Sequence, residues 1–159
     1  QTASATKNEG HISPSAKYGL LEEPTYVVFN GRPGALTGER ALGKYDEPIQ
    51  RGDDARFFVG NIGPNLISSF HVIGEIFDKV YVEGSFNLVN ENVQSTAIPA
   101  GGAAGMEMTF EAPGHYIPVD HAIYRTQKGA KGIIQVQGDP NRDVYDPVSK
   151  SGVRGESVY

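Results

Sequence analysis

Short runs of β-branched and aromatic residues, separated by glycine and proline, are the dominant pattern of this chain. Residues 79–83 (KVYVE) alternate apolar and polar positions with a period of two, which is typical of a strand with one exposed face. Runs with helical periodicity are scarce. The pattern predicts eight or nine short strands, among them residues 25–30, 55–60, 66–73, 79–83, 93–98, 105–110, 115–119 and 132–136.

The spacing of these strands predicts the fold class and the domain organisation. Turn residues recur about every ten positions, which is typical of an all-β sandwich or barrel. The segments 1–20 and 139–159 are polar and too poor in apolar residues to form core elements. We therefore expect a polar N-terminal arm or linker at 1–20, one domain at 21–138, and a tail at 139–159 that is either disordered or docked on a neighbouring chain.

Composition narrows the possible functions. A length of 159 residues with 38% hydrophobic residues suits one domain. The net charge of −5, without a basic stripe, argues against a nucleic-acid partner. The chain has no cysteine, so it contains no disulfide, no thiolate zinc site and no cysteine-ligated blue copper centre.

Two histidines, His71 and His121, are the main candidates for chemistry. Each lies in an extended-looking segment, and imidazole is the commonest protein ligand for transition metals. A catalytic metal site normally needs three protein ligands. Either the two histidines are structural, or the rest of the site comes from another chain. His115 lies about 20 Å from His121 in an extended strand, so those two cannot share a metal, and we expect His115 to be a surface residue.

Other chemical motifs are missing. Residues 101–105 (GGAAG) are rich in glycine but lack the lysine of a phosphate-binding loop, and no nucleophile-elbow motif occurs. The sequence therefore gives no support to nucleotide or hydrolase chemistry.

Three segments carry a family resemblance: residues 63–84 (GPNLISSFHVIGEIFDKVYVEG), 92–104 (NVQSTAIPAGGAA) and 113–138 (PGHYIPVDHAIYRTQKGAKGIIQVQG). In order and spacing they resemble the second cupredoxin domain of copper-containing nitrite reductases, most closely the outer-membrane-associated branch. The resemblance covers roughly residues 21–138 and implies a cupredoxin-like Greek-key β-sandwich.

The resemblance also implies roles for individual residues. The family is a homotrimer of two-domain subunits, with a type 1 copper in the first domain and a catalytic type 2 copper shared between subunits. His121 matches the type 2 copper ligand that comes from the second domain. His71 matches an active-site histidine that hydrogen-bonds through water toward the substrate, and Ile73 matches the apolar residue over the copper. Gln94 and Ser95 correspond, more weakly, to supporting positions behind that histidine.

The function that the resemblance implies is one-electron reduction of nitrite to nitric oxide, as the C-terminal part of a dissimilatory nitrite reductase in denitrification or nitrate assimilation. The enzyme would be complete only with a first cupredoxin domain, on the same precursor or on a separate chain. A trimer, an electron-donor cupredoxin or cytochrome c, and a periplasmic or outer-membrane-associated location are implied too. The alternatives are a cupredoxin-like assembly module without copper and a fragment of a two-domain multicopper oxidase, although the His-x-His and His-Cys-His signatures of the latter are absent.

Overall fold

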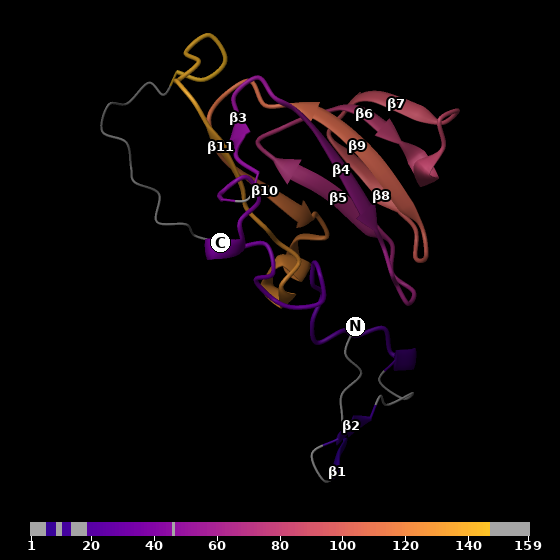
Figure 1. The fold of residues 1–159 in the computed structure, drawn as a ribbon. Helices are drawn as coiled ribbons and strands as arrows, with labels where there is room; N and C mark the ends of the chain where they lie inside the picture. Colours follow the sequence, from indigo (N-terminus) through magenta and orange to yellow (C-terminus); the bar gives the residue numbers. More distant parts are fainter. Residues whose placement is uncertain (1–5, 9–10, 14–18, 46, 147–159) are drawn as a thin grey trace.

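Two β-sheets face each other across an apolar core in the computed structural model (Figure 1). The structure describes residues 6–8, 11–13, 19–45 and 47–146. One sheet has the strand order β3 (Ile49–Gln50), β11 (Ile134–Gln137), β10 (Gly114–Asp120), β5 (Ser68–Ile73) and β8 (Ser95–Ile98). The other has the order β4 (Asp54–Gly60), β9 (Ala103–Thr109), β6 (Phe77–Tyr81) and β7 (Val89–Val93).

The chain crosses repeatedly between the sheets. β4 and β5, β7 and β8, and β9 and β10 are consecutive in sequence but lie in different sheets. Within the sheets the pairing is antiparallel, except that β11 pairs in parallel with β3. Three short 3₁₀ helices occupy connections: η1 (Gly38–Arg40), η2 (Val82–Gly84) and η3 (Ile123–Lys128). The fold is therefore the expected all-β, cupredoxin-like Greek-key sandwich.

Alternating side chains build the core. In β5, Phe70 and Val72 are buried and belong to the apolar cluster between the sheets. β9 contributes Met106 and Met108 from the opposite sheet, both almost fully buried. Since neighbouring side chains of a strand point to opposite faces, Ser69, His71 and Ile73 lie on the outer face of the five-stranded sheet.

Most expected strands exist, with shifted ends, but the structure departs from the expectation at three places. Residues 25–30 form no strand, although Val27, Val28 and Phe29 are partly buried. The polar segment Val89–Val93, which the alternation pattern did not mark, forms the edge strand β7 through pairing with β6. Residues 49–50, which lie outside every expected strand, form the short strand β3.

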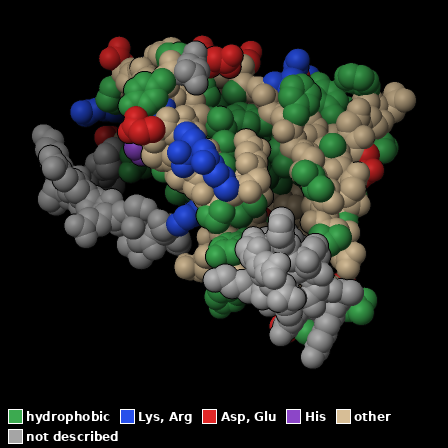
Figure 2. Space-filling model, turned by 60° about the horizontal axis from the view of Figure 1, so that its bottom comes forward, with side chains coloured by type: hydrophobic (Ala, Val, Ile, Leu, Met, Phe, Trp, Pro, Cys, Tyr) green, Lys and Arg blue, Asp and Glu red, His purple; other side chains and the backbone are tan. Residues whose placement is uncertain are grey.

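The structure describes only parts of the two terminal segments. β1 (Thr6–Asn8) pairs with β2 (His11–Ser13) in a two-stranded sheet of its own. Parts of the expected arm (residues 1–5, 9–10 and 14–18) and most of the expected tail (residues 147–159) lie outside the described residues. Within the described ranges, no helix is long and apolar enough to cross a membrane. Figure 2 shows hydrophobic side chains reaching the surface between polar ones. Among the described residues, Ile62, Phe58 and Phe86 are some of the most exposed large hydrophobic ones.

Candidate functional site

β5 presents His71 and Ile73 on the outer face of the five-stranded sheet. Both are half-buried, while Phe70 and Val72 between and beside them point into the core. β5 ends at Ile73, and the next residue, Gly74, has a φ of +102°, which is unfavourable for other residues; a Cβ there would lie 3.0 Å from the Tyr116 ring. The turn at Gly74 therefore ends the outer-face surface that His71 and Ile73 form.

The register between β5 and β10 brings the second histidine to the first. Val119 pairs with His71, and Asp120 pairs with Phe70, so His121 emerges directly beside β5. The backbone N–H of His121 donates a hydrogen bond of 2.7 Å to the carbonyl of Ser69. The imidazole rings of His71 and His121 lie 5.2 Å apart between centroids, inclined at 64°. Two residues fifty positions apart in sequence are therefore neighbours on one surface.

The orientation of His71 is set by the next strand. Its Nδ1 is hydrogen-bonded to the backbone carbonyl of Gln94, which connects β7 to β8. A carbonyl only accepts, so Nδ1 is the donor, and Nε2 of the neutral ring is left as an acceptor. Ser95 of β8 pairs with His71 of β5. Gln94 and Ser95 thus both lie beside His71, and their proposed supporting role stays a prediction.

Ile73 and His115 differ in their relation to the pair. Ile73 lies on the same face as His71 and pairs with Ile117 of β10, so an apolar strip runs beside the histidine. His115 is exposed and pairs with Gln135 of β11, toward the opposite end of β10. The structure therefore brings together His71 and His121 but leaves His115 apart, as the spacing predicted.

A polar network below His121 was missed by the sequence interpretation. The buried carboxylate of Asp120 accepts hydrogen bonds from Ser68, Ser69, Ala122 and Arg125. The available signal was an acidic residue closing an apolar strand directly before the histidine, with an arginine five residues after the acid.

The donor chemistry fits part of a copper site. Imidazole nitrogen suits copper, and the exposed ring of His121 offers one such ligand. No group of three or more His, Cys, Asp or Glu side chains able to hold a metal occurs within the described residues. Further ligands would therefore have to come from elsewhere.

Comparisons with known proteins show that the chain is similar to part of copper-containing nitrite reductases. No protein-family model matches the chain. Over 126 residues the chain is 54% identical to the copper-containing nitrite reductase of Neisseria meningitidis serogroup A, which covers 79% of this chain and 31% of that protein. The enzyme of the same name from Neorhizobium galegae is 39% identical over 127 residues, covering 79% of this chain and 32% of that protein. The chain thus spans about a third of the length of these curated relatives.

Solved structures agree on the fold. A copper nitrite reductase from Nitrosomonas europaea superposes with a TM-score of 0.69 at 29% identity, over 81% of this chain and 46% of that one. A copper-containing nitrite reductase from Thermus scotoductus gives 0.66 at 30% identity, over 80% and 29%. A multicopper oxidase gives 0.63 at 20% identity, over 73% and 39%, a likeness of fold alone.

Proposed function

Because this chain is homologous to 31% of the length of a copper-containing nitrite reductase, we propose that it supplies the C-terminal part of such an enzyme. The reaction is NO₂⁻ + 2H⁺ + e⁻ → NO + H₂O, at a type 2 copper shared between subunits. Copper, when bound, would supply the redox centre for the single electron. The observation that carries the proposal is the pair of adjacent imidazoles, His71 and His121, on the surface of a matching fold.

His121 is the ligand that this chain contributes. Its ring is exposed, whereas its backbone is fixed to Ser69, so the ring can reach a metal held mainly by another chain. A copper site completed by histidines of a first cupredoxin domain would explain why the described residues offer no third ligand.

His71 holds and delivers a proton. Since Nδ1 donates to the Gln94 carbonyl, Nε2 is the atom that gains and loses a proton toward the substrate side. Nitrite reduction consumes two protons per turnover, so a titratable ring beside the ligand histidine has a defined task. Ile73, two positions farther along the same face, would form an apolar wall that limits how nitrite approaches.

The finer parts of the proposal concern assembly and location. The first cupredoxin domain would lie on the same precursor or on a separate chain and would carry the type 1 copper. Closed threefold symmetry would repeat one interchain site three times. An electron-donor cupredoxin or cytochrome c, and a periplasmic or outer-membrane-associated location, complete the proposal.

Native mass spectrometry combined with a nitrite-reduction assay tests this function. The chain is measured alone and together with a first cupredoxin domain. We expect nitric oxide formation only in an assembly that contains both domains and copper. A chain that reduced nitrite without a first-domain partner would contradict the split site. An assembly of both domains that bound no type 2 copper would favour the assembly-module alternative.

A further inference from the structure

Asp120 is a buried carboxylate directly before the proposed copper ligand. It is 3% exposed and closes β10. Its Oδ2 accepts from Arg125 Nη1 at 2.6 Å and from Ser68 Oγ at 3.1 Å. Its Oδ1 accepts from the backbone N–H of Ser69 at 3.3 Å and of Ala122 at 3.1 Å. A buried charge requires such partners, and this carboxylate has four donors.

Arg125 connects this carboxylate to a second strand end. It lies in η3, and its side chain is 20% exposed. The Nη1 that pairs with Asp120 also donates to the backbone carbonyl of Ile67, 2.8 Å away, just before β5. One guanidinium therefore ties the end of β10, the start of η3 and the entry to β5 together.

Hydrogen bonds to Ser69 and Asp120 hold the backbone around His121. Ser69, whose carbonyl accepts the His121 N–H, gives its own N–H to Asp120. Ala122, the next residue, also donates its N–H to Asp120. The Asp120 carboxylate thus holds the peptide unit after His121 directly and the one before it through Ser69, while the His121 ring remains exposed.

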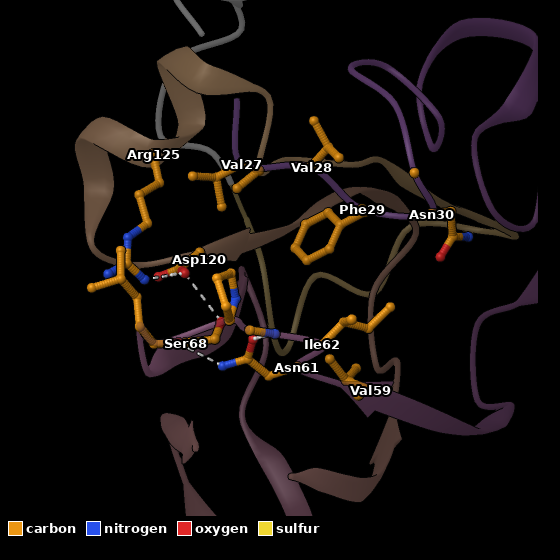
Figure 3. Close-up of a pocket in the computed structure, with 16 residues that line it drawn as sticks. Val27, Val28, Phe29, Asn30, Val59, Asn61, Ile62, Ser68, Asp120 and Arg125 are labelled. Carbon is orange, nitrogen blue, oxygen red and sulfur yellow. Dashed lines mark hydrogen bonds and ion pairs between the residues drawn. The ribbon is translucent and has the colours of Figure 1, made fainter. Parts of the chain in front are cut away.

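The network lies on the opposite side of the sheet from the ring. Asp120, Arg125 and Ser68 lie at one wall of a cavity of about 570 Å³, which Val27, Phe29 and Ile62 also line (Figure 3). In strand alternation Asp120 shares the inner face with Phe70, its partner in register, and not the face of His71. Asp120 therefore acts on His121 through the backbone and is not itself placed to touch a metal beside the ring.

We propose that the Asp120–Arg125 pair is the positioning device of His121. It holds the ligand ring in place against His71 before any metal binds, so that the copper half-site is formed within this chain. The metal part of this inference rests on the proposed function, whereas the positioning part concerns the chain alone. Outer residues that orient a metal ligand typically change metal affinity by about 10–100-fold when they are replaced.

Solution NMR of the chain tests the positioning without copper. The readouts are the NOE cross-peak between the His71 and His121 ring protons and the hydrogen-exchange protection of the His121 amide. We expect both in the wild type and in Arg56→Ala, a control that breaks an ion pair between β4 and β9. We expect Asp120→Ala to lose both, while the core amides of β5 and β10 keep their chemical shifts.

Milder variants keep the test decisive if Asp120→Ala does not fold. Asp120→Asn keeps an acceptor oxygen but loses the charge, and Arg125→Lys keeps the charge but loses the planar guanidinium. Both should weaken the cross-peak and the amide protection, with Asp120→Asn partly retaining the Ser69 contact. A cross-peak unchanged in these variants would overturn the inference.

A second arm separates this inference from the proposed function. In the assembly with a first cupredoxin domain, Asp120→Asn should lower copper affinity about 10–100-fold and alter the EPR hyperfine splitting of the type 2 copper. If ring geometry depends on Asp120 but no copper is bound even by the wild-type assembly, the proposed function fails and the positioning stands. If copper binds with unchanged affinity in Asp120→Asn, the metal part of the inference is wrong and the proposed function stands.

Discussion

Two arginine–carboxylate pairs, one across the four-stranded sheet and one between β10 and η3, differ in burial and in what they hold together. Arg56 of β4 donates through Nε, at 2.9 Å, and through Nη2 to Glu107 of β9, and its side chain is 61% exposed. Arg125 pairs with Asp120, whose side chain is only 4% exposed. An exposed pair typically contributes less than about 1 kcal/mol, whereas breaking a buried pair costs about 3–5 kcal/mol.

The two ion pairs also differ in which parts of the fold they hold together. The Arg56–Glu107 pair joins two neighbouring strands, β4 and β9. The backbone pairing of these strands already fixes their register, so they do not depend on the ion pair. The Asp120–Arg125 pair instead organises a turn that leaves β10 and carries His121. The buried charge of Asp120 therefore lies directly before the exposed imidazole of His121, at the end of β10 where we propose the copper site.

The largest expected effect is on stability. Arg125→Met leaves Asp120 buried without its cation and should lower the free energy of unfolding by about 3 kcal/mol. Arg56→Met, the matched change in the other sheet, should cost less than about 1 kcal/mol. Urea denaturation of both variants measures the difference. Equal losses would mean that the two pairs are equivalent and that burial does not distinguish them.

The next effect concerns catalysis in the assembly with a first cupredoxin domain. His71→Ala should lower the rate of nitrite reduction about 10²-fold or more, the usual range for a group that transfers protons, while copper content stays unchanged. Arg56→Ala on the other sheet should leave the rate unaltered. Loss of copper in His71→Ala would make His71 a ligand, and full activity would make it structural.

A smaller effect should appear in the response to salt. The coupling free energy from a double-mutant cycle at Arg56 and Glu107 should shrink between 0.1 and 1 M salt, since the Debye length falls from about 10 to 3 Å. The coupling between Asp120 and Arg125 should change little over the same range because burial shields it from mobile ions. A buried pair that weakened as strongly as the exposed one would refute the contrast.

The smallest effect belongs to a third carboxyl, Glu75, which accepts a hydrogen bond from the Ile76 N–H. Burial raises the pKa of Glu75 above its usual 4.5, and the charges of Asp78 and Glu111 raise this pKa further, against the lowering effect of that hydrogen bond. The folded state therefore binds the proton more tightly than the unfolded state, and the ionised group costs stability at neutral pH.

Glu75→Gln should accordingly raise the melting temperature at pH 7. The gain should shrink as the pH falls through the raised pKa and vanish below about 4.5, where the carboxyl is protonated in both states. Thermal unfolding followed by circular dichroism between pH 4 and pH 7 measures it. A gain that stayed constant over this range would show that the charge of Glu75 is not the cause.

The sequence predicted those strands in which buried and exposed residues alternate. It was wrong for apolar residues that are buried outside a strand and for a strand that is hardly buried at all. Val27, Val28 and Phe29 look like a strand, but they line the cavity beside Asp120, and the N–H of Val27 bonds to Lys128 in η3. The strand Val89–Val93 is polar because it lies at a sheet edge with little burial, so only its pairing with β6 reveals it.

The candidate site was predictable in its residues but not in its geometry. His71 and His121 stand out in sequence, and the family resemblance suggested their roles. Their 5.2 Å proximity depends on the register of β5 with β10, which no local pattern encodes. The resemblance pointed to Gln94, but the contact to His71 is made by the Gln94 backbone carbonyl, which any residue at that position would supply.

The central claim is that His121 is the copper ligand supplied by this chain, and its most direct test compares two histidines of one strand region. Copper content is measured by mass spectrometry in assemblies of the chain with a first cupredoxin domain, for His121→Ala and for His115→Ala, an exposed control in β10, the strand that His121 follows. The account predicts that His121→Ala loses the type 2 copper and keeps the type 1 copper, while His115→Ala keeps both. Retention of type 2 copper in His121→Ala, or its equal loss in both variants, would contradict the account.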